Sequence, residues 1–292
     1  MVSLTAWMES WIECRSIRLK PSTIDGYRGN LRRYIAPHPI GDMPINEIAP
    51  EHIVVLLAPI VAKGYTRQAQ LVQIMLGAAL KYAVKQRILM YNPVDCVDKI
   101  QHTSKETPWL TADQARHFLR VARDRRDPFL LAWQLGMVCG LRRGEILGIK
   151  YQDIDFDRLQ LHVCRQRVPR NGKLIEAPPK SRTSVRDIPI SSAMAEQLRF
   201  MRRDGYLVDC SMGMLYTALE KALRAAQLPR ISLHGLRHTM AAVAASDGVP
   251  IKILQMIMGH AQFSTTADVY AHVDRGALRG AALQIATRLE IA

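Results

Sequence analysis

The sequence predicts a mostly α-helical protein of two domains, with a small antiparallel β-sheet inserted in the second domain. Apolar residues recur at 3/4 spacing over most of the chain, which is the pattern of amphipathic helices. Alternation with a period of two is confined to a short central stretch, where strands are expected. The length of 292 residues is enough for two hydrophobic cores, since one domain typically takes roughly 100–200 residues.

The composition is that of a folded globular protein. Hydrophobic residues make up 48% and charged residues 23% of the chain, which argues against extensive disorder. The longest apolar run, residues 53–62, is interrupted by Pro59 and is far shorter than the ~20 residues of a membrane span. The N-terminus lacks the basic and apolar regions of a secretion signal. We therefore expect a soluble protein of the cytoplasm that has no membrane partner.

The net charge favours a polyanionic partner. The chain has 40 Lys and Arg against 26 Asp and Glu, a formal net charge of +14, which makes nucleic acid the first candidate. Basic residues exceed acidic ones on both sides of Ser104. Charge alone leaves open a solvated basic surface with no such partner.

The cysteines indicate neither a disulfide framework nor a zinc site. They are five in number, widely scattered and without a C-x-x-C pair. We expect reduced core residues. The five are Cys14, Cys96, Cys139, Cys164 and Cys210.

Residues 1–100 are expected to form the first, all-helical domain. One helix begins at Pro21, a second spans about 50–63 and a third spans about 66–85. The apolar face of the first comprises Ile24, Tyr27, Leu31, Tyr34 and Ile35, and that of the third comprises Leu71, Ile74, Met75, Ala78, Ala79 and Tyr82.

Residues 101–108 (QHTSKETP) have no large apolar side chain and are expected to form a linker. Directly after them, Thr111 and Gln114 fit a capping box, in which Thr111 is the N-cap and Gln114 the N3 residue. The second domain is therefore placed at 109–292, and its first part, to about Gly148, is again helical.

The strands are expected in the middle of the second domain. Leu159, Leu161 and Val163 alternate with polar residues, and Asn171-Gly172 favours a hairpin turn. Residues 185–190 provide a further short strand. From about Ser211 the pattern returns to helix, with breaks at residues 248–250 and at Gly259.

Four short segments contain the residue types of a catalytic site. They are 140–145 (GLRRGE), Lys180 between two strands, 234–239 (HGLRHT) and 259–273, which contains His260 and Tyr270. Each has a plain structural explanation by itself. For example, Arg142 and Glu145 could form a helix-surface pair contributing about 0.2–0.5 kcal/mol.

Taken in order, the four segments resemble the tyrosine recombinases, the lambda-type phage integrase family. GLRRGE is similar to the first arginine motif, and Lys180 precedes VRDIPI as the hairpin lysine of the family precedes its strand. HGLRHT resembles the H-x-L-R-H-[ST] box, and the ending from MGH through TTADVYAHV resembles that of the family. The resemblance covers the catalytic half, and the N-terminal helices are similar, less specifically, to the core-DNA-binding domain.

The chemistry of these side chains agrees with phosphodiester transfer. Arg142 and Arg237 can each present paired N–H donors to phosphate oxygens. His234 lies three residues before Arg237 on one helix face and could accept a proton from the nucleophile Tyr270. A covalent phosphotyrosine retains the energy of the broken bond, so no cofactor and no metal ion is expected.

The resemblance implies the remaining roles. Lys180 would donate a proton to the 5′-oxygen that leaves, and His260 would add a hydrogen bond in the transition state. Glu145 would orient its neighbours in a supporting role. Arg142 is preferred to Arg143 because it stands three residues before Glu145, as in the family motif.

Partners follow from the same resemblance. They are double-stranded DNA at attachment or core sites, and three further copies of the chain in a homotetramer on two DNA sites. An excisionase or a host DNA-bending protein is a further candidate partner, in a bacterial cell. The segment 278–291 is expected to be helical and to pack either in cis or on a neighbouring protomer.

Two alternatives belong to other classes of function. A metalloenzyme could use His234, His238 and His260, but the H-E-x-x-H glutamate is missing because position 235 is glycine. A sequence-specific DNA-binding protein without strand transfer would suit the charge, yet it would not need Tyr270 and Lys180 together with both arginines. Type IB topoisomerases share the chemistry, but the two-domain size favours recombinases.

Overall fold

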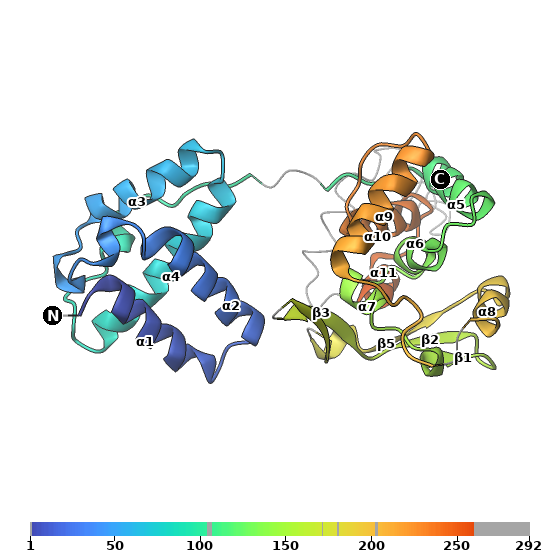
Figure 1. The fold of residues 1–292 in the computed structure, drawn as a ribbon, viewed down its shortest axis with the longest axis horizontal. Coiled ribbons are helices and arrows are strands. Elements are labelled where there is room, and N and C mark those ends of the chain that lie inside the picture. Colours follow the sequence, from blue (N-terminus) through green and yellow to red (C-terminus); the bar gives the residue numbers. More distant parts are fainter. Residues whose placement is uncertain (1, 104–106, 171, 180, 202–203, 260–292) are drawn as a thin grey trace, which may run out of the picture. The chain divides into compact units, whose positions relative to one another are not determined.

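The computed structural model describes residues 2–103, 107–170, 172–179, 181–201 and 204–259. The chain divides into two units, Met1–Lys105 and Glu106–Ala292 (Figure 1). Each unit has its own hydrophobic core. Within the described ranges no helix is long and apolar enough to cross a membrane.

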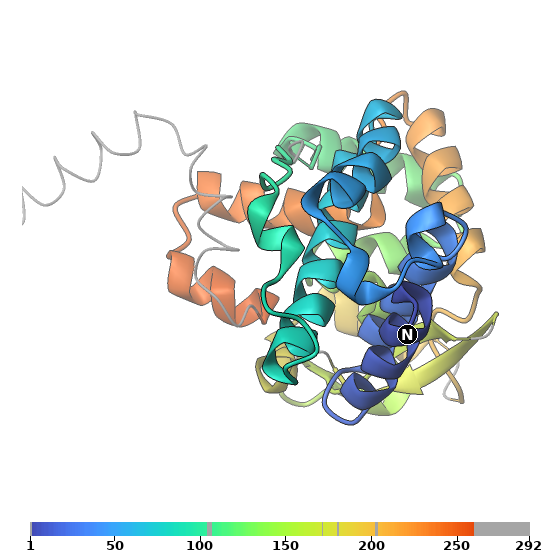
Figure 2. The same ribbon diagram turned by 90° about the vertical axis from the view of Figure 1, so that its left-hand side faces the viewer.

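The first unit is built from four α-helices joined by short helical turns. Figure 2, in which this unit faces the viewer, shows α1 and α2 in dark blue beside each other. The α-helices are α1 (Leu4–Ser16), α2 (Pro21–Asn30), α3 (Pro50–Ala62) and α4 (Thr66–Lys85), and the turns are η1 (Leu31–Ile35), η2 (Pro39–Gly41), η3 (Ile45–Glu47) and η4 (Pro93–Cys96). The helices expected from Pro21 and over 66–85 are confirmed.

The buried face of α4 differs from the expected one. Leu71 and Ile74 are exposed, at 37% and 57%, whereas Val72 and Leu76 are fully buried. Two apolar stripes run along this helix, and its contacts with α1, α3 and η4 decide which of them is covered. The expected face was therefore wrong at Leu71 and Ile74.

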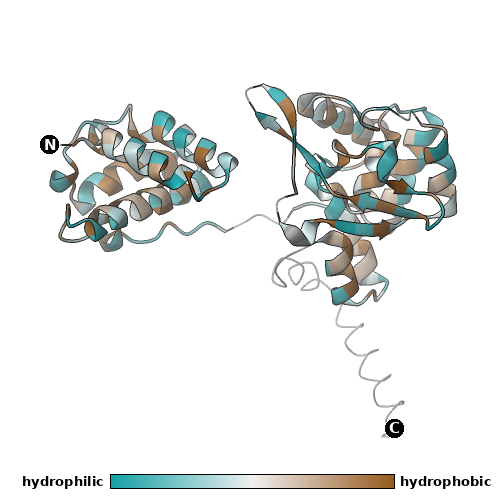
Figure 3. Cartoon of the chain, turned by 90° about the horizontal axis from the view of Figure 1, so that it is seen from below, coloured by the Kyte–Doolittle hydropathy of each residue, from teal (hydrophilic) through white to brown (hydrophobic). Residues whose placement is uncertain are grey.

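The second unit places helices around two small antiparallel sheets. Its helices are α5 (Ala112–Asp124), α6 (Leu130–Met137), α7 (Arg143–Ile146), α8 (Ser192–Arg199), α9 (Met212–Ala225), α10 (Leu233–Ser246) and α11 (Ile251–Met258), with turns η5 (Tyr151–Asp153) and η6 (Arg182–Ser184). Brown and teal positions are mixed along these helices in Figure 3, as expected for helices with one buried face.

The strands form two separate sheets. The first has the order β1 (Ile154–Asp155), β2 (Gln160–Val163), β5 (Arg186–Pro189), and the second pairs β3 (Gln166–Arg170) with β4 (Lys173–Ala177). In the first sheet Leu161 lies opposite Ile188, and both are buried. Leu159, expected in a strand, instead has a φ of 52° in the turn before β2.

The capping box expected at Thr111 and Gln114 is confirmed. Thr111 Oγ1 accepts a hydrogen bond from the N–H of Gln114 (3.3 Å), and Gln114 Oε1 accepts one from the N–H of Thr111 (3.0 Å). The helix that follows, α5, packs Phe118 into the core against Trp133 of α6. The local capping signal therefore marks the first helix of this unit.

The cysteines are all free, as expected, but they are not all core residues. Cys139 is buried, which raises the pKa of its thiol to about 12. Cys14 and Cys96 are exposed, because Cys14 lies on the solvent side of α1 and Cys96 lies at the end of the turn η4. The expectation of core positions was wrong for these two residues.

Candidate active site

Arg142 reaches the site from the N-cap position of α7. The chain turns after α6 at Gly140, whose φ of 63° is in the left-handed region, and a Cβ there would lie 2.1 Å from Met240 Cε. This turn brings Arg142 directly before α7. Arg142 Nη1 donates to Glu145 Oε1 (2.8 Å) and to Ser184 Oγ (3.3 Å).

Glu145 is the buried acid of the site, with 2% of its surface exposed. Its Oε2 accepts the backbone N–H of Arg142 (2.9 Å), and both its oxygens accept N–H groups of Arg186 (3.2 and 3.0 Å). Burial by itself would raise the pKa of Glu145, but the hydrogen bonds and charges of Arg186 and Arg142 outweigh burial and lower it. Glu145 is therefore a carboxylate held between two guanidinium groups.

Arg186 is a functional candidate that the sequence patterns did not single out. It lies on β5, where Arg186 and Ile188 face inward and Asp187 and Pro189 face outward. A charged residue in the inward register of a strand is unusual unless it is paired. That register, together with the place of Arg186 in the VRDIPI segment, was the available signal. Ser184, the last residue of the turn η6, is 1% exposed and accepts from Arg142, and it too was not singled out from the sequence.

Arg237 is fully buried on α10, a helix that begins after the N-cap Ser232. Its Nη1 donates to the carbonyl of Gly140 (2.5 Å) and its Nη2 donates to the carbonyl of Met258. Nε is buried and has no hydrogen-bond partner within the described part of the chain. Burial, followed by the charge of Arg142, lowers the pKa of Arg237 to about 9, so it remains a cation at neutral pH.

Three arginines converge on the C-terminal end of α11. Successive carbonyls of residues 257, 258 and 259 accept from Arg186 Nε (2.6 Å), Arg237 Nη2 and Arg142 Nη2 (2.8 Å), respectively. The last carbonyls of a helix lack partners within the helix and carry partial negative charge. The helix ends at Gly259 with a φ of 60°. The arginines thereby fix the point from which the chain continues to residue 260.

His234 stands beside this cluster on the first turn of α10. Its ring packs edge to face against that of His238, with centroids 4.9 Å apart. Burial, then the charges of His238, Arg237 and Arg142, lowers the pKa of His234 to about 4. His234 is therefore a neutral imidazole at physiological pH, which can accept a proton.

Arg143 points to a different neighbour. Its Nη1 donates to the hydroxyl of Tyr216, and its guanidinium lies 6.0 Å from the centre of that ring. Arg142, by contrast, contacts Glu145 and the end of α11. Of the two adjacent arginines, Arg142 belongs to the cluster, as the sequence motif favours.

The base of the β3–β4 hairpin is tied to the unit by polar contacts. Glu176 accepts from Lys150 Nζ (2.9 Å) and from the hydroxyl of Tyr206 (2.8 Å). The guanidinium of Arg167 lies 4.1 Å from the ring centre of Tyr206. These contacts fix the hairpin just before the segment that contains Lys180.

The structure thus brings four of the expected residues together: Arg142, Glu145, His234 and Arg237. The other three, Lys180, His260 and Tyr270, lie outside the described residues. Within the described ranges there is no group of three or more His, Cys, Asp or Glu side chains that could hold a metal ion.

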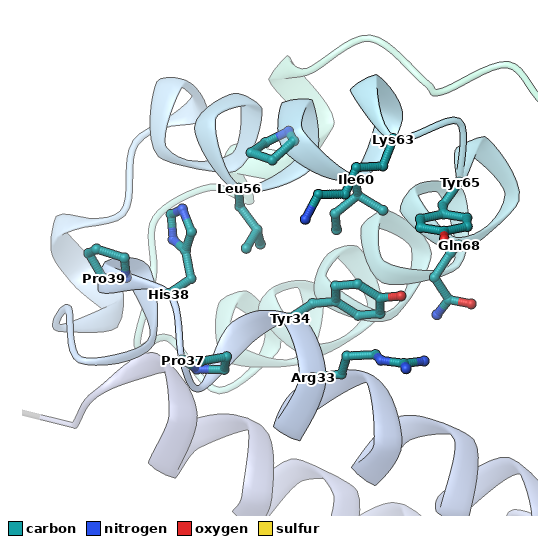
Figure 4. Close-up of a pocket in the computed structure, with 11 residues that line it drawn as sticks. Arg33, Tyr34, Pro37, His38, Pro39, Leu56, Ile60, Lys63, Tyr65 and Gln68 are labelled. Atoms are coloured by element: carbon teal, nitrogen blue, oxygen red, sulfur yellow. The ribbon is translucent and has the colours of Figure 1, made fainter.

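The first unit contains a basic and aromatic hollow of about 640 Å³ (Figure 4). Arg33 and Tyr34 line it from η1, Lys63 and Tyr65 from the connection between α3 and α4, and Gln68 from α4. Cationic and aromatic side chains in one open hollow suit a phosphate backbone and its sugars or bases.

Comparison with known proteins now identifies the family. The family model described as "Phage integrase family" matches residues 108–276, and that described as "Phage integrase central domain" matches residues 4–99. The chain belongs to the phage integrase family. It is a tyrosine recombinase, an enzyme that breaks and rejoins DNA.

Relatives of this integrase support the same assignment. A "Tyrosine recombinase XerC-like" protein of Caldanaerobacter subterraneus is 27% identical, over 93% of this chain and 80% of the relative. Among solved structures, the Tn1549 transposon integrase in complex with a circular intermediate DNA has a TM-score of 0.81 at 21% identity, covering 97% of this chain and 100% of that one. A lambda integrase tetramer bound to a Holliday junction has a TM-score of 0.71 at 20% identity, covering 92% and 77%. These likenesses establish the integrase fold.

Proposed function

We propose that this integrase cleaves DNA by attack of Tyr270 on a phosphodiester and rejoins it through a covalent 3′-phosphotyrosine. The observation that carries the proposal is the convergence of Arg142 and Arg237 on the end of α11, eleven residues before Tyr270, with the neutral His234 one turn before Arg237 on α10. Integration or excision of a phage or another mobile element is the proposed outcome.

The two arginines are the proposed phosphate ligands. Arg142 has 27% of its side chain exposed, so it can exchange a carbonyl partner for a phosphate oxygen. The buried Nε of Arg237 provides a donor without a protein partner in the described ranges. Donors fixed in place before the reaction stabilise the charge that develops in the transition state.

The proposed proton transfers balance the exchange. His234 takes the proton of the Tyr270 hydroxyl as its oxygen forms the bond to phosphorus. The bond from phosphorus to the 5′-oxygen breaks, and Lys180 supplies the proton to that oxygen. Rejoining is the reverse reaction with a new 5′-hydroxyl group, so no external energy source is needed. His260 stabilises the transition state, and Glu145 holds Arg142.

Residues 1–100 are the proposed core-DNA-binding domain, residues 101–108 the linker and residues 109–292 the catalytic domain. The hollow lined by Arg33 and Lys63 would contact the DNA backbone. By analogy with the lambda integrase tetramer on a Holliday junction, four protomers would act on two DNA sites. An excisionase or a host DNA-bending protein would set the direction of the reaction. The cytoplasm of a bacterial cell is the proposed place of action.

The direct test is capture of the covalent adduct. Wild type and Tyr270→Phe are each incubated with fragmented source-genome DNA in EDTA, denatured, and the protein-linked DNA is sequenced. We expect adducts from wild type alone, concentrated at one sequence. A matched control, Tyr216→Phe, should give an adduct yield within about threefold of wild type, since Tyr216 contacts Arg143 outside the cluster. Adducts that persist in Tyr270→Phe would contradict the proposed nucleophile.

A further inference from the structure

We propose that Arg186 is a positioning residue for strand cleavage. It shares the charge of Glu145 with Arg142 and anchors the last turn of α11, so that Arg142 can exchange a protein partner for the scissile phosphate and the chain leaves α11 from a fixed point. This role rests on the function proposed above.

The contacts of Arg186 join three segments that are distant in sequence. Nε donates to the carbonyl of Ile257 on α11, and the terminal nitrogens donate to Glu145 in α7 and to the carbonyl of Ser184 before β5. Only 6% of the Arg186 side chain is exposed. Figure 1 shows α7, α11 and β5 gathered in one part of the second unit.

The end of α11 also contacts Arg186 directly. A Cβ on Gly259 would lie 3.1 Å from Arg186 Cδ and 2.8 Å from the carbonyl oxygen of Thr183. Glycine at this position therefore allows the end of α11 to pack directly against the side chain of Arg186. Because residue 260 follows at once, a displacement of Arg186 would be passed to the start of the segment that leads to Tyr270.

The electrostatics give Arg186 a second task. Glu145 is shared between Arg186 and Arg142, and buried carboxylates need paired charges. Without Arg186, both carboxylate oxygens would be left to Arg142, which would hold Arg142 more firmly away from a phosphate. A neutral amide at position 145 would remove that competition.

The two tasks predict a specific pattern of variants. Arg186→Met should slow single-turnover cleavage at saturating DNA by roughly 100-fold, the scale of a misplacement of about 1 Å, and change the half-saturating DNA concentration by less than about threefold. The double variant with Arg186→Met and Glu145→Gln should cleave at least about fivefold faster than Arg186→Met alone, because the two side chains are directly coupled. Arg186→Lys, which cannot reach both Glu145 and Ile257 with one ammonium group, should remain slow.

The experiment measures adduct formation on the duplex site recovered by wild type in the capture test above. The matched control is Arg158→Met, because Arg158 is 79% exposed and pairs with Asp155 at the other end of the sheet. Urea unfolding of each variant establishes that it is folded. If Arg186→Met does not fold, the comparison is made with Arg186→Lys instead.

The outcomes separate the two proposals. Slow cleavage by Arg186→Met with partial recovery in the double variant supports the positioning role. Cleavage at the wild-type rate in a folded Arg186 variant overturns the positioning role. A double variant that cleaves no faster than Arg186→Met also overturns it, because Arg186 would then only stabilise the fold. An absence of adducts from wild type would instead overturn the proposed function itself.

Discussion

The catalytic cluster and the hollow of the first unit are both basic, but they are organised in opposite ways. In the cluster, Arg142 and Arg186 are hydrogen-bonded to a carboxylate that is 2% exposed. In the hollow, neither Arg33 nor Lys63 forms an ion pair with another described residue. Fixed donors act through geometry, whereas open cations act through their charge. We therefore expect changes in the cluster to affect rate and changes in the hollow to affect affinity.

The largest expected effect is that of Arg142→Lys. A lysine keeps the charge but loses the planar pair of donors, so cleavage at saturating DNA should fall by roughly 100-fold or more, the usual cost of one lost transition-state donor. Arg143→Lys is the matched control at the neighbouring position, and its cleavage rate should stay within about threefold of the wild-type rate. Single-turnover adduct formation measures both. An equal loss from the two variants would mean that charge, and not geometry, governs the cluster.

The pH dependence of cleavage tests His234. Because its pKa is lowered to about 4, His234 is in the neutral, proton-accepting form above that pH. At subsaturating DNA, where the rate reports on the free enzyme, lowering the pH from 7 to 5 should leave the rate within about twofold. With a histidine of the ordinary pKa of about 6.5 as the base, the rate would fall by about 25-fold over that range. DNA binding is measured in parallel, so that a change in affinity is not mistaken for loss of the base.

The features that depend on neighbouring residues in the chain can be predicted from the sequence. The helix over residues 66–85 and the capping box at Thr111 depend on neighbours within a few positions, and both appear where the sequence places them. The segments of Arg142 and Arg237 are also visible as motifs. Each of these signals is contained in a short stretch of chain.

The rest depends on contacts between distant segments. Which stripe of α4 is buried depends on its neighbours, and so Leu71 and Ile74 were misplaced. The bond from Arg186 to Ile257 joins residues 71 positions apart, and nothing in either local pattern indicates it. The sequence hints at Arg186 were its place in the VRDIPI segment and its inward register on β5.

A smaller effect is expected for the hollow. Arg33→Gln and Lys63→Gln should each reduce the slope of log affinity against log salt by about 1, since each removes one phosphate contact. Cleavage at saturating DNA should stay within about threefold of wild type. The control is Lys81→Gln, which is exposed near the opposite end of α4 from Gln68. Fluorescence anisotropy at several salt concentrations gives the slopes, and unchanged slopes would remove the hollow from the DNA interface.

The smallest effect is expected for Thr111→Ala. Loss of the N-cap hydrogen bond of α5 should cost about 1 kcal/mol of stability. Since the two units have separate cores, amide hydrogen exchange should rise roughly fivefold in the second unit and stay unchanged in the first. Thr217→Ala, at an exposed position within α9, should not accelerate exchange. A rise in both units would show that they unfold together.

The measurement that tests the central claim most directly is the identity of the residue that carries the DNA. Wild-type adduct is digested with trypsin and nuclease, and the nucleotide-bearing peptide is fragmented by mass spectrometry. Cleavage at Lys252 and Arg275 releases residues 253–275, in which Tyr270 is the single tyrosine. We predict the phosphonucleotide on Tyr270, joined through its 3′-phosphate. A nucleotide on another residue, or joined through a 5′-phosphate, would contradict the account.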